Sequence, residues 1–94
     1  MKIAWTPEAE QDRAAIWGYL VARDPAAAIR MDQLFGEAVA KLADFPMLGH
    51  VGMVAGTREL TPHRSYRIIY EIAVDTVWIL VVTHTARQWP PPQS

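Results

Sequence analysis

Apolar residues in the first half of the chain recur at helical spacing. Lys2 to Trp5 is a strand candidate, and Thr6-Pro7 then starts a helix predicted over residues 7–22, with a capping hydroxyl and a proline at its first position. Asp24-Pro25 repeats this start, so a second helix follows at once and forms a hairpin with the first. Pro46 ends it. Its predicted inward face comprises Met31, Leu34, Phe35, Ala38, Leu42 and Phe45.

The second half of the chain alternates apolar and polar residues instead. A loop marked by Gly49, Gly52 and Gly56 precedes a predicted strand from Gly56 to Leu60 and a turn over Thr61 to Arg64. Ser65 to Ile72 is the next strand, with Tyr66, Ile68, Tyr70 and Ile72 on one face and Arg67, Ile69 and Glu71 on the other. Val77 to His84 is apolar on both faces and predicts a central strand.

This order of elements, β-α-α-β-β-β, predicts an α+β fold of two layers. The helical hairpin covers one face of a mainly antiparallel four-stranded sheet, and Arg67 lies on the other face. We expect one domain over residues 1–94, with an extended tail from about residue 86 because Pro90, Pro91 and Pro92 exclude a regular helix.

Composition narrows the possible functions. The 94 residues contain no cysteine, which excludes thiolate metal cages, disulfide scaffolds and cysteine nucleophiles. The N-terminus lacks a signal-peptide pattern and no apolar run is long enough for a membrane span, so we expect a cytoplasmic protein without membrane contact. A net charge of −1 argues against strong non-specific binding to nucleic acid. The histidines lack metal spacing, and neither a metal nor another cofactor is expected.

Positive charge gathers in the second half of the chain. Arg67 lies within a strand, where it is either an anion clamp on the open sheet face or the partner of Glu59 or Glu71 in an ion pair. Arg58 and Arg64 are weaker candidates, since charged residues at strand edges and turns are usually solvated.

Two further features near the C-terminus attract attention. His84 ends the last strand near Arg87, which suits either general acid-base chemistry on a phosphodiester or a hydrogen bond to the backbone. Trp89 stands beside Pro90, and either docks on the sheet or anchors a partner.

Several local strings, in this order, resemble the RelE/ParE family of bacterial type II toxin-antitoxin toxins across nearly the whole chain. They are WTPEA at 5–9, FPMLG at 45–49, TREL at 57–60, YRIIYEI at 66–72, VWILVVTH at 77–84 and RQWP at 87–90. The resemblance implies a toxin that forms a hetero-oligomer with a cognate antitoxin, which wraps across helices and sheet. The exposed flank formed by Trp17 and Val21 suits such wrapping.

The family has two activities. RelE-like members cleave mRNA on the ribosome, and the resemblance assigns Arg58, Arg67, His84 and Arg87 to places comparable to their catalytic groups. No lysine follows Lys41, however, so the set is incomplete. ParE-like members act on DNA gyrase without being nucleases, and need a docking surface rather than a general base.

The ParE-like activity is the favoured expectation. It would use a surface formed by Arg64, Arg67, Arg87 and Trp89, since arginine and tryptophan are enriched at binding hot spots. Two alternatives stay open: a RelE-like endoribonuclease, which would make the protein an enzyme, and a degenerate toxin that only binds its antitoxin.

Overall fold

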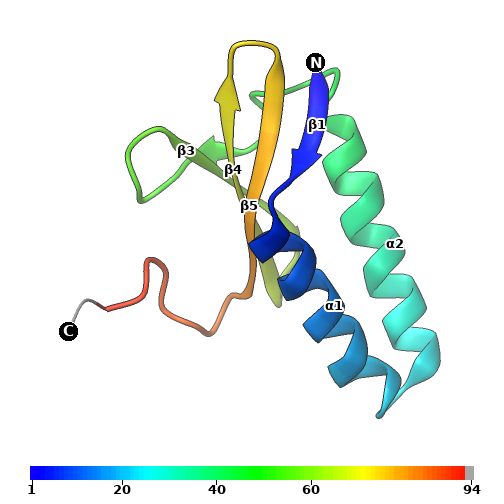
Figure 1. Cartoon of the computed structure of the whole chain (residues 1–94). Coiled ribbons are helices and arrows are strands. Elements are labelled where there is room, and N and C mark those ends of the chain that lie inside the picture. Colours follow the sequence, from blue (N-terminus) through cyan, green and yellow to red (C-terminus); the bar gives the residue numbers. More distant parts are fainter. Residues whose placement is uncertain (93–94) are drawn as a thin grey trace.

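The computed structural model describes residues 1–92, with two helices on one side of a five-stranded sheet (Figure 1). The elements are β1 (Lys2–Trp5), α1 (Pro7–Val21), α2 (Pro25–Lys41), β2 (His50–Val51), β3 (Thr57–His63), β4 (Tyr66–Ala73) and β5 (Thr76–His84). The α+β class and the helical hairpin are therefore confirmed. After β5 the C-terminal tail extends away from the end of the sheet without forming a helix or strand (Figure 1).

Both helices begin at the predicted caps. The Thr6 hydroxyl oxygen accepts a hydrogen bond from the Ala9 amide at 3.1 Å, and an Asp24 carboxylate oxygen accepts one from the Ala27 amide at 3.2 Å. A proline occupies the first turn of each helix, where its missing amide proton costs nothing. The sequence signals for helix initiation act as expected.

The sheet has the order β1-β5-β4-β3-β2, so the predicted count of four strands is wrong by one. The added strand, β2, has only two residues, which pair with Glu59 and Arg58. Such a short strand has no alternating pattern of its own and exists because β3 offers it an edge. All pairs are antiparallel except β1 with β5, which run parallel, and the two helices connect β1 at one edge of the sheet to β2 at the other.

Two predicted boundaries are also wrong. The helix α2 ends at Lys41 with its cap at Leu42, so Phe45 does not join the inward face and is 64% exposed. Strand β3 continues through Pro62 to His63, where a turn was predicted. Proline is tolerated there because β2 pairs only with Arg58 and Glu59, which leaves the outer edge of β3 free at Pro62.

The core lies between the helices and the predicted face of β4. Tyr66, Ile68 and Tyr70 are buried, and Ile72 packs beside them. The helices contribute Ala9, Phe35, Val39 and Leu42, and β5 contributes Val77, Ile79 and Val82. This apolar layer fixes which face of the sheet points away from the helices.

The start of α1 also covers the edge of β5 beyond the end of β1. The Thr6 hydroxyl donates to the Leu80 carbonyl oxygen at 3.3 Å, and the Asp12 carboxylate accepts the Val82 amide proton with an oxygen-nitrogen distance of 3.0 Å. Backbone groups that would otherwise lack partners are satisfied by side chains of α1.

Candidate functional site

Arg67 lies on the open face, as predicted, and is paired there with an acid. Its Nη1 is 3.4 Å from Oε1 of Glu59, and its Nη2 donates to the Thr85 carbonyl oxygen at 3.1 Å. The side chains of Arg67 and Glu59 are 24% and 4% exposed. Because the guanidinium charge is offset by a buried carboxylate, Arg67 offers little attraction to an external phosphate.

Glu59 is the centre of this arrangement. Besides Arg67, its carboxylate lies 3.9 Å from Nε2 of His50 and accepts the Met53 amide proton at 3.1 Å. One buried acid therefore joins β2, β4 and the loop before β3, and Arg67 extends the connection to Thr85, the first residue after β5. The carboxylate holds these segments together.

Arg58 points to the other side of the sheet. It pairs across the strands with Tyr70, and therefore shares the helix-facing side with that residue. Its Nε and Nη2 donate to the Gly49 carbonyl oxygen at 3.0 and 2.6 Å, and Nη2 also donates to the Met47 carbonyl oxygen at 3.2 Å. Arg58 thus fixes the backbone of the 45–51 loop.

His84 lies at the far end of that same side. It pairs with Tyr66, and the two rings make an edge contact with centroids 5.3 Å apart. Its Nδ1 accepts the Ala86 amide proton at 3.0 Å, which is the backbone role considered for it from sequence. A cavity of about 370 Å³ brings His84 together with Tyr19, Tyr66 and Arg87. Burial, followed by the proximity of Tyr19, raises the pKa of Tyr66 above 10.0.

The four candidate nuclease residues therefore do not converge on one point. His84 and Arg87 share a cavity, while Arg67 lies on the opposite face of the sheet. Arg58 pairs with Tyr70, which is four residues along β4 from Tyr66, the partner of His84. Four residues of strand span about 13 Å. An arginine separated in this way cannot contact the same phosphate as His84.

The remaining candidates lie at the surface or in the tail. Arg64 is exposed in the β3–β4 turn, where its carbonyl oxygen accepts the Thr85 hydroxyl at 2.7 Å, and Arg87 is exposed. Trp89 is half-buried, and its indole Nε1 is buried without a hydrogen-bond partner among residues 1–92. Trp89 is thus partly docked rather than fully solvated.

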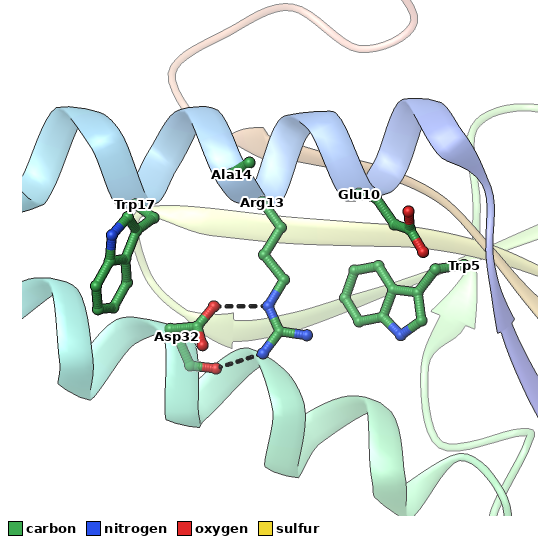
Figure 2. Close-up of a pocket in the computed structure, with 6 residues that line it drawn as sticks. All are labelled: Trp5, Glu10, Arg13, Ala14, Trp17 and Asp32. Atoms are coloured by element: carbon green, nitrogen blue, oxygen red, sulfur yellow. Dashed lines mark hydrogen bonds and ion pairs between the residues drawn. The ribbon is translucent and has the colours of Figure 1, made fainter.

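A groove between α1 and α2 contains one of the predicted binding residues, Trp17, which is 39% exposed (Figure 2). The cavity of about 490 Å³ is lined by Trp5, Glu10, Arg13, Ala14, Trp17 and Asp32. Val21, one helical turn beyond Trp17, is 37% exposed and extends the apolar surface. Both residues are therefore available to a partner.

Arg13 reaches across this groove from α1 to α2, between Trp17 and Trp5 (Figure 2). Its Nε and Nη2 donate to a carboxylate oxygen and the carbonyl oxygen of Asp32 at 2.6 and 3.1 Å, and its guanidinium lies 5.0 Å from the centre of the Trp5 ring (Figure 2). Sequence reasoning missed Arg13 and Asp32 as site residues. The i, i+4 spacing of Arg13 and Trp17 indicates that they share one face of a helix. The contribution of Asp32, however, depends on how the two helices align, which the sequence does not show.

Neither a metal cluster nor a membrane span is found in the part of the chain that the structure describes. Residues 1–92 contain no group of three or more potential metal-ligating His, Asp or Glu side chains. None of the helices in this range is long and apolar enough to cross a membrane. The surface of α1 has a groove and the exposed apolar side chains of Trp17 and Val21, and such features are typical of protein recognition.

Residues 3–89 match the family described as the ParE toxin of the type II toxin-antitoxin system, parDE. The chain belongs to this family. It is 40% identical to the Y4kP protein of Sinorhizobium fredii (strain NBRC 101917 / NGR234) over 95% of this chain and 93% of that protein. It is also 35% identical to Toxin RelE2 of Caulobacter vibrioides (strain ATCC 19089 / CIP 103742 / CB 15) over 92% and 97% of the two chains.

Solved structures agree with the assignment to the ParE family. A chain of the chromosomal ParDE TA system from P. aeruginosa superposes with a TM-score of 0.80 at 26% identity, over 89% of this chain and 95% of that chain. The YoeB/ParE toxin from Agrobacterium tumefaciens gives 0.64 at 16% identity, over 89% and 98%. The second likeness shows only the shared fold, and this ParE-family chain is a type II toxin.

Proposed function

We propose that this ParE-family toxin arrests growth by binding DNA gyrase and not by cutting mRNA. The observation that carries the proposal is the separation of Arg58, Arg67 and His84, together with the neutralisation of Arg67 by buried Glu59. A nuclease needs its acid-base and charge-stabilising groups within reach of one phosphate. A protein inhibitor has no such requirement, and it would act in the cytoplasm, where gyrase meets the chromosome.

A type II toxin of this family also implies a cognate antitoxin as partner. We propose that the antitoxin occupies the groove between α1 and α2, with an apolar side chain between Trp5 and Trp17. Glu10 lies at the groove and is exposed, whereas the charge of Arg13 is already paired with Asp32. The groove therefore favours a segment in which an apolar residue lies near a lysine or arginine.

A RelE-like nuclease is the second candidate, because one cavity does hold His84, Arg87 and two tyrosines. The two activities are separated by one comparison with purified toxin. We expect inhibition of gyrase supercoiling, relieved by the antitoxin, and no cleavage of mRNA on translating ribosomes.

Variants sharpen this comparison. His84→Ala is expected to leave gyrase inhibition within about threefold of wild type, since the imidazole packs on the Tyr66 ring and accepts a hydrogen bond from the Ala86 amide. Codon-spaced mRNA cuts that disappear in His84→Ala would overturn the gyrase assignment. Absence of growth arrest with intact antitoxin binding would instead identify a degenerate toxin.

A further inference from the structure

The segment between α2 and β3 exposes a group of large apolar side chains that neither the core nor the helical groove uses. Their exposed fractions range from 37 to 76%. They are Phe45, Met47, Leu48, Val51, Met53 and Val54, and we call them the 45–54 surface. From residue 45 to residue 57 the chain has no Asp, Glu, Lys or Arg, although these four make up 20% of all its residues. A solvated loop rarely has this composition.

The backbone of this segment is held in place by the protein interior. The hydroxyl of fully buried Tyr70 accepts the Gly49 amide proton at 2.9 Å and donates to the Pro46 carbonyl oxygen at 2.7 Å. Arg58 donates to the Gly49 and Met47 carbonyl oxygens, as described above. The backbone comes so close that a Cβ on Gly49 would lie 2.6 Å from the Glu59 carbonyl oxygen.

The far end of the segment is fixed as well. The Met53 amide proton is bound by buried Glu59 at 3.1 Å, and the Thr57 hydroxyl donates to the Val54 carbonyl oxygen at 2.7 Å. The apolar side chains therefore point outward from a fixed backbone. Such fixation lowers the entropy lost on binding, and it is a property of preformed interfaces.

A hollow in this surface combines apolar walls with a cation. Its volume is about 270 Å³, and its lining includes Met47, Val51, Ile72 and Arg58. Arg58 uses Nε and Nη2 for the loop, and among residues 1–92 its Nη1 has no hydrogen-bond partner. The hollow suits one apolar side chain of a partner, with a carboxylate beside it to reach Nη1.

The exposed apolar area is large enough for an interface. Six large side chains with these exposures present on the order of 600 Å². This summed area is most of the roughly 800 Å² that one partner contributes to a standard interface.

We propose that the 45–54 surface docks the toxin onto its folded protein target, which presents an apolar side chain next to an acidic one. This inference rests on the proposed function for the identity of that target as gyrase. A fixed surface matches a folded partner, because neither side then needs to change shape. An antitoxin segment that folds on binding is better served by the groove between the helices.

The experiment tests whether variants of the 45–54 surface and of the groove between α1 and α2 separate target inhibition from antitoxin binding. Met47→Gln/Val51→Thr keeps side-chain size but makes the hollow polar, and Trp17→Ala truncates the groove. Ile29→Gln is the matched control, since Ile29 is an exposed apolar residue, 49% accessible, on α2 outside both surfaces. Each protein is assayed for growth arrest on induction, gyrase inhibition, antitoxin affinity, oligomeric state and thermal unfolding.

We expect Met47→Gln/Val51→Thr to abolish growth arrest and to raise the half-inhibitory concentration for gyrase by at least about thirtyfold, with antitoxin affinity within about twofold. Trp17→Ala should show the reverse, and Ile29→Gln should behave like wild type. If the double variant unfolds at a lower temperature, Val51→Thr alone replaces it, with the same direction and a smaller effect.

Other outcomes overturn the proposal. Unchanged growth arrest by a folded double variant would do so, as would selective loss of antitoxin binding, which makes the surface part of the antitoxin site. Conversion of a wild-type dimer to a monomer would assign the surface to a second copy of the chain. If wild type arrests growth without inhibiting gyrase, the gyrase assignment is wrong, and growth arrest alone then decides the docking surface. A wild type that does neither overturns both.

Discussion

The two faces of the sheet are stabilised by different interactions. Toward the helices, Phe35, Ile68 and Tyr70 are at most 1% exposed and pack as an apolar layer. On the opposite face Glu59 is 3% exposed and is neutralised by Arg67. Apolar packing loses stability in proportion to the volume removed, whereas a buried ion pair loses it when either member is left alone. Mutations on the two faces should therefore fail in different ways.

The largest effect is expected on the helix-facing side. Phe35→Ala removes a side chain that is 1% exposed and makes an edge contact with Tyr66 at 5.4 Å. We expect the free energy of unfolding to fall by about 4 kcal/mol, because apolar surface is lost and a cavity remains. Chemical denaturation with urea measures this change.

Phe45→Ala is the matched control for this loss. It makes the same change at a side chain that is 64% exposed, and should alter the free energy of unfolding by less than about 0.5 kcal/mol. Equal losses at the two positions would contradict the assignment of Phe45 to the surface.

The next effect concerns the open face. Glu59→Gln leaves Arg67 partly buried without its counter-charge, while the amide keeps the size of the side chain. We expect a loss of about 2 kcal/mol, below the range for a fully buried pair because the Arg67 side chain is 24% exposed. The double variant Glu59→Gln/Arg67→Met should recover part of that loss in urea denaturation. A double variant as unstable as the sum of the two single variants would argue against coupling.

The contrast between the faces also explains what the sequence could predict. The helix-facing residues Tyr66, Ile68 and Tyr70 follow from alternation alone, and the helix starts follow from Thr6 and Asp24. The sequence leaves Arg67 as an anion clamp or as the partner of Glu59 or Glu71, because it does not define the strand register. In the folded protein Glu59 pairs across the strands with Ile69, two residues from Arg67 on the same face of β4, and this register selects Glu59 as the partner of Arg67. The groove residue Asp32 and the two-residue strand β2 depend on tertiary contacts in the same way.

A smaller effect tests the fixation of the 45–54 surface. Tyr70→Phe removes the hydroxyl bound to Gly49 and Pro46, and leaves the buried Gly49 amide and the partly buried Pro46 carbonyl without this partner. We expect a loss of about 1–2 kcal/mol and faster amide hydrogen exchange at Gly49. Tyr66→Phe is the control, since the contacts of Tyr66 with Phe35 and His84 are made by its ring. Unchanged exchange at Gly49 in Tyr70→Phe would show that the Tyr70 hydroxyl is not needed to fix the loop.

The smallest expected effect is a pH dependence of the free energy of unfolding that arises from Tyr66, which belongs to the core and lines the cavity that contains His84. Burial raises the pKa of Tyr66 above 10.0, so in the folded state its phenol keeps its proton at a pH where an unfolded tyrosine has begun to lose it. Between the two pKa values the unfolded state binds fewer protons, and the free energy of unfolding falls as the pH rises. The stabilisation is complete below pH 10 and is lost as the pH passes through the folded pKa. Unfolding temperatures should therefore decline less steeply above pH 10 in Tyr66→Phe than in wild type. Identical slopes, together with a tyrosinate absorbance difference centred on the ordinary pKa, would show that water reaches the Tyr66 hydroxyl freely.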